Sequence, residues 1–216
     1  SPLKNGIIEM KYMTAREEDI LTNQNLIKNG TVIDKLLQSL IITPIDYNDL
    51  LIGDKNAILI ASRILGYGQE YSFTYTHPIT GEDEEVTVDL TEAEDIVLDE
   101  SLIMNNKNEF SFILPTSKTE VTFKLLTHGD ERQIDQELKG LKKISKLSSS
   151  ELTTRMKNMI LSVNGSYDKK TIREFVDGAF LARDARALRE YAGSIMPDID
   201  MTFDLDVDHF IYHRID

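Results

Sequence analysis

The order of apolar and polar residues divides the chain into a mixed first half and a mainly helical second half. Apolar residues at helical spacing predict helices that begin near residues 14, 31 and 54. Strict alternation predicts two β-hairpins, over 71–90 and 110–126, and the first turns between Pro78 and Gly81. Residues 7–13 are compatible with a further strand.

The expected helix starts carry recognisable caps. Thr14 followed by Glu17 forms a capping box, and Ser148 with Glu151 repeats it. The acids that follow Thr14 favour the positive end of the helix dipole, so this charge cluster has a structural explanation. The helix from Asp54 is apolar on nearly every side, which predicts a central, buried helix that ends at Gly66 or Gly68.

Helical spacing dominates from Asp130 onward. Stripes of apolar residues predict helices near 130–141, 148–163, 172–179 and 181–192, with Asn164-Gly165 ending the second and Pro197 closing the region. A strand then follows in which Met201, Phe203, Leu205 and Val207 face inward and the intervening aspartates face water.

These patterns predict an α+β protein, predominantly helical, with two short antiparallel β-hairpins and a short β tail. The expected parts are an α+β part at 1–128, a helical part at 129–195 and a strand with tail at 196–216. They would form one cooperative unit or two closely packed lobes.

Composition is that of an ordinary globular protein: 216 residues, 41% hydrophobic and 28% charged. The net charge of -13 argues against binding nucleic acid through a broad basic face. No apolar run is long enough for membrane insertion, since the best one, 57–65, is short and contains Arg63. No signal peptide opens the chain, which starts Ser1-Pro2 without Met, as a trimmed N-terminus would.

Candidate chemistry is sparse. The chain has no cysteine, which excludes disulfides and Cys-ligated zinc. The aspartates at 198–208 with His209 and His213 suggest a metal site, but the EF-hand template fails because its glycine and terminal glutamate positions hold His209 and Ile215. His77 and His128 lack a nucleophile or carboxylate at catalytic spacing. We therefore expect no catalytic residue, no bound metal and no cofactor.

Charge is unevenly distributed. Residues 81–100 contain ten acids and no Lys or Arg, whereas residues 131–190 carry 13 basic residues against nine acids. Either these are two solvated faces of opposite sign, or they dock onto each other between copies or onto other proteins. The candidate contact residues in these regions are Glu82, Asp83, Glu84 and Glu85, and the helical stripe of Arg183, Arg186 and Arg189.

Six ordered segments carry a resemblance to a known family. They are "MTAREEDIL", "DLLIGDKNAILIASRILGYG", "VTFKLLTHGDE", "DKKTIREFVD", "ARALREY" and "PDIDMTF", which together extend over roughly residues 10 to 204. In this order they resemble the baseplate hub family of T-even-type contractile-tailed bacteriophages.

The resemblance implies a structural protein of the viral tail, a hub subunit that contacts other baseplate proteins and possibly itself, with no catalytic residue. It would be located in the virion baseplate, and in the host cytoplasm during assembly. One alternative is a hub assembly factor that leaves before the tail is complete; a distant one is a wall-degrading hydrolase of the baseplate. In the "MTAREEDIL" signature the cap uses Arg16 and Glu18 least, so we expect them to make contacts.

The chain departs from the family pattern in two places. Many relatives have a Cys-x-x-Cys pair at the tip of the first hairpin, where this chain reads Thr76 to Gly81, so a zinc-knuckle role is absent. Relatives also continue after "DMTF" with a strand pair, whereas here Phe203 runs quickly into an aromatic end. A deletion or missing residues would account for the shorter tail.

Overall fold

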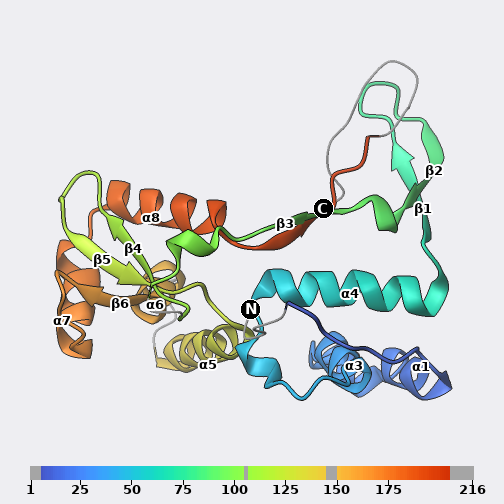
Figure 1. Cartoon of the computed structure of the whole chain (residues 1–216), viewed down its shortest axis with the longest axis horizontal. Coiled ribbons are helices and arrows are strands. Elements are labelled where there is room, and N and C mark those ends of the chain that lie inside the picture. The colour runs from blue at the N-terminus through green and yellow to red at the C-terminus, as the bar shows by residue number, and fades with distance from the viewer. Residues whose placement is uncertain (1–5, 105–106, 145–149, 205–216) are drawn as a thin grey trace. The chain divides into compact units, whose positions relative to one another are not determined.

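The computed structural model describes residues 6–104, 107–144 and 150–204 (Figure 1). Their elements are mixed α and β with helix predominating, which confirms the predicted α+β class. The described residues form two compact units. Unit 1 comprises residues 6–45, 53–96 and 198–204, and unit 2 comprises residues 46–52 and 97–197. The chain therefore passes between the units four times. The division into parts at 128 and 195 stays a prediction.

Unit 1 begins with three short helices, α1 (Ala15–Leu21), α2 (Gln24–Lys28) and α3 (Val32–Leu40). The predicted apolar side of α3 is Val32, Ile33, Leu36, Leu37 and Leu40, of which the three leucines are buried and Ile33 is exposed. Residues 7–13 do not form the expected strand. They make one bridge, Met10 to Ile41, and a few backbone hydrogen bonds to the end of α3, so no regular ladder develops.

The long helix of unit 1, α4 (Ile52–Tyr67), starts two residues before the expected Asp54 and is followed by Gly68 at φ +87°. Our expectation of a central, buried helix is wrong, because most of its side chains are only partly covered and Ile58 is its one buried large apolar residue. Apolar residues lie on several sides of α4, and its neighbours within the unit cover only part of their surface.

The first hairpin is confirmed as β1 (Glu70–Thr76) paired with β2 (Asp83–Asp89). Its apolar face packs against α4 and the short 3₁₀ turn η2 (Leu90–Glu92), around a small core of Val88, Leu90 and Phe203. The β tail is shorter than expected: β7 (Asp198–Asp200) pairs with β3 (Glu94–Ile96) over three residues. Phe203 is buried as predicted, whereas Leu205, Val207, His209 and His213 lie outside the described residues.

Unit 2 is built on a three-stranded antiparallel sheet, ordered β4 (Phe110–Ile113), β5 (Glu120–Phe123) and β6 (Ile160–Val163). The β4–β5 pair confirms the second predicted hairpin. The helices of this unit are α5 (His128–Ile144), α6 (Glu151–Met159), α7 (Lys169–Glu174) and α8 (Ala182–Ser194), with a π-helical turn, η4 (Phe175–Ala179), after α7. Short 3₁₀ turns lie at η1 (Tyr47–Asp49) and η3 (Glu100–Leu102).

The region predicted to be helical from 129 to 195 contains a strand, which corrects the expected helix over 148–163. That helix ends at Met159, and Ile160 to Val163 pair with β5. The physical reason is the Asn164-Gly165 turn, whose residues have φ of 47° and 78° and which closes a two-residue hairpin between Val163 and Ser166. The capping residue expected at Ser148 lies outside the described residues.

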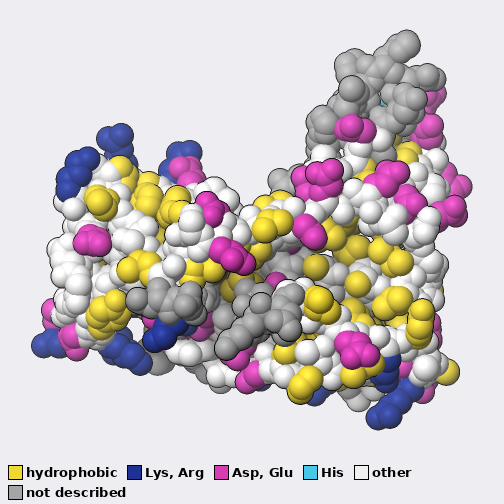
Figure 2. Space-filling view, in the orientation of Figure 1, with side chains coloured by type: hydrophobic (Ala, Val, Ile, Leu, Met, Phe, Trp, Pro, Cys, Tyr) yellow, Lys and Arg dark blue, Asp and Glu magenta, His cyan; other side chains and the backbone are white. Residues whose placement is uncertain are grey.

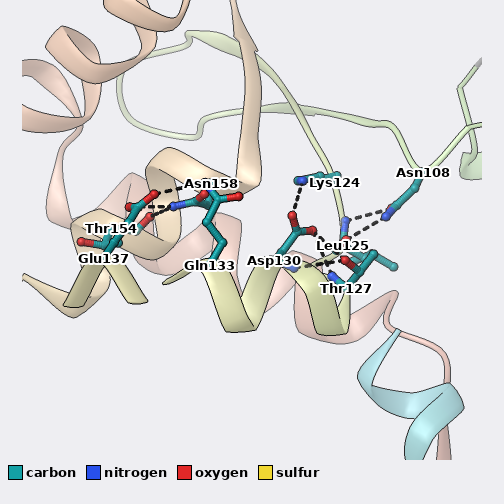
Figure 3. A network of polar contacts seen from close by, with 9 residues as sticks. All are labelled: Asn108, Lys124, Leu125, Thr127, Asp130, Gln133, Glu137, Thr154 and Asn158. Atoms are coloured by element: carbon teal, nitrogen blue, oxygen red, sulfur yellow. Dashed lines mark hydrogen bonds and ion pairs between the residues drawn. The ribbon is translucent and has the colours of Figure 1, made fainter. Parts of the chain in front are cut away.

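Polar contacts join α5 to the end of β5, and Asn158 of α6 to Glu137 of α5 (Figure 3). Thr127 and Asp130 exchange hydrogen bonds at the start of α5 in the manner of a capping box, and Lys124 of the preceding loop forms an ion pair with Asp130 at 2.6 Å. The Asn108 amide bonds both the N–H and the C=O of Leu125. These bonds fix the start of α5 against the end of β5.

Candidate docking surfaces

The N-terminal turn of α8 holds the loop between β4 and β5. Asp184, with no exposed surface, accepts hydrogen bonds from the backbone N–H of Thr116 at 2.7 Å and of Ser117 at 3.0 Å. Burial alone would raise the pKa of Asp184, but these hydrogen bonds outweigh it and the pKa lies below its usual value. The carboxylate thus fixes this loop to the helix.

An open pocket of about 630 Å³ lies between that loop and α8. Its lining consists of Pro115, Thr116, Arg183, Arg186, Ala187 and Glu190. Two of the three predicted contact arginines are therefore brought to one cavity. Arg189 is not in the lining, and its Nε donates to the Ala185 carbonyl of its own helix at 3.3 Å.

The two pocket arginines differ in their partners. Arg186 is exposed and forms an ion pair with Glu190 at 2.7 Å, which raises the pKa of its guanidinium. Arg183 is also exposed, and it has no carboxylate within ion-pair distance among the residues that the structure describes. Of the two arginines in the pocket lining, Arg183 is therefore the one whose positive charge has no paired carboxylate among the described residues.

The predicted acidic residues lie together on the β1–β2 hairpin. Glu82, Asp83, Glu84 and Glu85 are all exposed, and in the described part of the chain none of them has an ion-pair partner. Figure 2 shows acidic side chains on this hairpin and basic side chains over α8. Asp83 and Glu85 share the hairpin's polar face, where their cross-strand partners are Thr76 and Thr74.

The signature segment around α1 contains one buried structural acid and two exposed charged residues. Glu17 is completely buried, completes the predicted capping box with Thr14 and forms an ion pair with Lys11 at 2.8 Å. Hydrogen bonds from Lys11, and then from Thr14, lower the pKa of Glu17 from 4.5 to about 2. Arg16 and Glu18 are exposed, and the Glu18 carboxylate accepts a hydrogen bond from the Tyr67 hydroxyl.

A cluster that the sequence patterns did not indicate lies beside Glu18. The Arg63 guanidinium lies 5.2 Å from the ring centre of Tyr67 and 5.7 Å from that of Tyr71, and it donates hydrogen bonds to the Gly68 and Glu70 carbonyls. Both rings remain exposed, at 50% and 38%. Arg63 interrupts an apolar run, which is the one sequence signal that could have drawn attention to it.

The histidines within the described residues have structural surroundings. His77 accepts hydrogen bonds from the Ile79 and Thr80 N–H groups at the hairpin tip, and the buried His128 ring meets Tyr47 edge-on at 4.8 Å. Across residues 6–104, 107–144 and 150–204, no group of three or more His, Asp or Glu side chains is placed to hold a metal ion. No helix in this part of the chain is long and apolar enough to cross a membrane.

A family model described as "T4 bacteriophage base plate protein" matches residues 1–206. The chain belongs to this family. The match extends through both units. No curated protein and no solved structure is significantly similar to this base plate protein. The resemblance to T-even-type baseplate proteins is thereby confirmed, and the base plate protein has a structural role in the phage tail.

Proposed function

We propose that this base plate protein is a subunit of the baseplate hub that acts through protein–protein contacts and has no enzymatic step. The observation that carries the proposal is the family match over residues 1–206. Its partners are other hub and baseplate proteins, and its locations are the virion baseplate and, during assembly, the host cytoplasm.

The exposed charged groups support contact as the mode of action. In the signature, the buried Glu17 serves the cap, which leaves the exposed Arg16 and Glu18 for a partner. Tyr67 and Tyr71 extend this surface with aromatic area. Tyr and Arg are the residue types that most often dominate the energy of protein interfaces.

Quantitative mass spectrometry of purified infectious particles tests the hub assignment. A fixed small copy number per particle is the expected result. The second candidate, an assembly factor, predicts the opposite: the chain is absent from particles and present in infected-cell lysate bound to hub proteins. That outcome would overturn the hub assignment and leave the family membership intact.

A paired variant tests the signature surface. Arg16→Glu reverses an exposed charge on α1, and Lys28→Glu makes the same charge change on the exposed end of α2. We expect Arg16→Glu to reduce co-purification of identified baseplate components and Lys28→Glu to leave it unchanged. Equal binding by both variants would remove Arg16 from the interface.

The distant alternative, a wall-degrading hydrolase, needs two carboxylates at a set separation, one of them with a raised pKa. Every described carboxyl group with a clear shift has a lowered pKa, for example Asp89, Asp168 and Asp200. We therefore expect no lysis of cell-wall preparations by the purified chain. Lysis that persists after repeated purification would establish the hydrolase instead.

A further inference from the structure

The pocket on α8 has a preformed wall. Asp184 is buried in the first turn of α8 and holds the N–H groups of Thr116 and Ser117. The loop that carries Pro115 and Thr116 therefore keeps its position relative to Arg183 and Arg186, the cations on the helix side. A ligand that enters does not have to order this loop, which lowers the entropic cost of binding.

The lining selects an acidic ligand. Arg183 has no carboxylate partner among the described residues, and a guanidinium binds a carboxylate through two parallel hydrogen bonds. Glu190 works against an acidic ligand, because it occupies Arg186 and adds a negative charge to the lining. A ligand with two carboxylates would pair one of them with Arg183. Its second carboxylate would displace Glu190 from Arg186.

The same chain contains a segment of matching chemistry. Asp83 and Glu85 project from one face of β2, and alternate residues of a strand lie about 6.5–7 Å apart. Arg183 and Arg186 are three residues apart on α8, a separation of about 5–6 Å on a helix surface. The spacing of the two carboxylates and that of the two cations differ by about 1–2 Å, which flexible acidic and guanidinium side chains can take up. Both carboxylates can therefore pair with the two cations at once.

We infer that the pocket lined by Arg183 and Arg186 receives the acidic β1–β2 hairpin of a second copy of this chain, through Asp83 and Glu85. The contact joins two different surfaces, so two copies either exchange hairpins reciprocally and close as a dimer or leave one hairpin and one pocket open for further copies. In the second case the contacts continue until a ring closes, or else they form a filament. The inference adds a self-contact to the proposed hub function, and the purified chain alone tests it without phage particles.

Charge exchange between two variants is the test. Arg183→Glu with Arg186→Glu reverses the pocket, and Asp83→Lys with Glu85→Lys reverses the hairpin. By analytical ultracentrifugation, we expect the wild type to associate with rising concentration and each variant alone to associate about tenfold or more weakly. Mixing the two variants should restore association, because both hairpin–pocket pairs again have opposite charges.

Matched substitutions separate this contact from a general charge effect. Arg189→Glu changes an arginine of the same helix outside the lining, and Glu92→Lys changes an exposed acid of the same acidic segment; both should associate like the wild type. Glu190→Gln should strengthen association, because it removes the competing carboxylate. Rising salt should weaken association of the wild type, since exposed charges are screened over about 10 Å at 0.1 M ionic strength.

Three outcomes would overturn the inference. They are a wild-type chain that stays monomeric at every concentration, a mixture that associates no better than its components, and an Arg189→Glu variant as weak as the pocket variant. Circular dichroism of each variant confirms that it is folded before association is compared. A hub subunit that remains monomeric would refute the self-contact and leave the proposed function standing.

Discussion

A single carboxylate, that of Glu17, joins the start of α1 to the segment before it. Its two oxygens accept hydrogen bonds from Lys11, from the Thr14 hydroxyl and from the Thr14 N–H, at 2.8, 2.6 and 3.0 Å. The capping box accounts for the bond from the Thr14 N–H, and its sequence signature predicts that bond; the bond from the Thr14 hydroxyl is additional. The bond to Lys11 has no such signature, because it depends on how residues 7–13 run past the helix.

Glu17→Gln should remove an acid-sensitive part of the stability. The folded-state pKa of about 2 lies below the ordinary 4.5, so the ionised group stabilises the fold above pH 4.5 and this contribution is lost as the pH falls toward 2. Urea unfolding at pH 7, 4 and 3 should show a less stable variant at pH 7 whose deficit shrinks in acid. A deficit that stays constant from pH 7 to pH 3 would contradict the role of the Glu17 carboxylate.

Asp184→Asn should loosen the wall of the α8 pocket. The asparagine has one acceptor oxygen where the aspartate offers two, so one of the N–H groups of Thr116 and Ser117 loses its partner. We expect a loss of about 1–3 kcal/mol in the free energy of unfolding, measured by urea denaturation. Asp135→Asn, at an exposed position of α5, should change it by less than about 0.5 kcal/mol. Equal stability of the two variants would show that the loop does not depend on Asp184.

At the scale of elements, the two hairpins were predicted from the sequence, whereas strand β6 was not. Both hairpins follow from strict alternation, since a strand with one covered face needs it. Strand β6 was missed because Met156, Met159, Ile160 and Val163 continue a helical spacing. Asn164-Gly165 was the better signal, because both residues adopt positive φ, as a tight hairpin turn requires.

The charged residues of the docking surfaces could be predicted from the sequence, but the pocket could not. The sequence places Arg183 and Arg186 one helical turn apart, and it places Asp83 and Glu85 on one face of a strand. It does not indicate the pocket, because Pro115 and Thr116 approach α8 only through the tertiary bonds to Asp184. Nor does it indicate that Arg63 lies between two exposed tyrosines.

One substitution made at two glycines tests the turn that follows β6. Gly165 has φ of 78°, so Gly165→Ala should cost about 1–2 kcal/mol although nothing lies within 4 Å of the added Cβ. Gly140 lies within α5 with equal space, so Gly140→Ala should stabilise by about 0.5–1 kcal/mol. Urea midpoints give both values. Equal signs for the two would contradict the hairpin that follows β6.

At the scale of the whole molecule, the two units differ in how much apolar surface they bury. The unit 2 core contains 16 buried residues in one cluster, among them Phe110, Phe123 and Leu188. Among the described residues, the cluster around the unit 1 hairpin contains three, Val88, Leu90 and Phe203, and four further apolar residues of unit 1 are buried outside it: Leu36, Leu37, Leu40 and Ile58. Since apolar burial provides most of the stability of a fold, the units should differ in stability although the chain passes between them four times.

Hydrogen exchange followed by mass spectrometry in increasing urea should therefore resolve two unfolding transitions, with the unit 1 hairpin exchanging first. Leu188→Ala, at a side chain with no exposed surface, should lower the free energy of the unit 2 transition by about 2–5 kcal/mol. Phe203→Ala should shift mainly the transition of unit 1, whose small core it lines. Identical transitions for peptides of both units, shifted equally by either substitution, would show a single cooperative unit. In that case the acidic hairpin would unfold together with the core of unit 2.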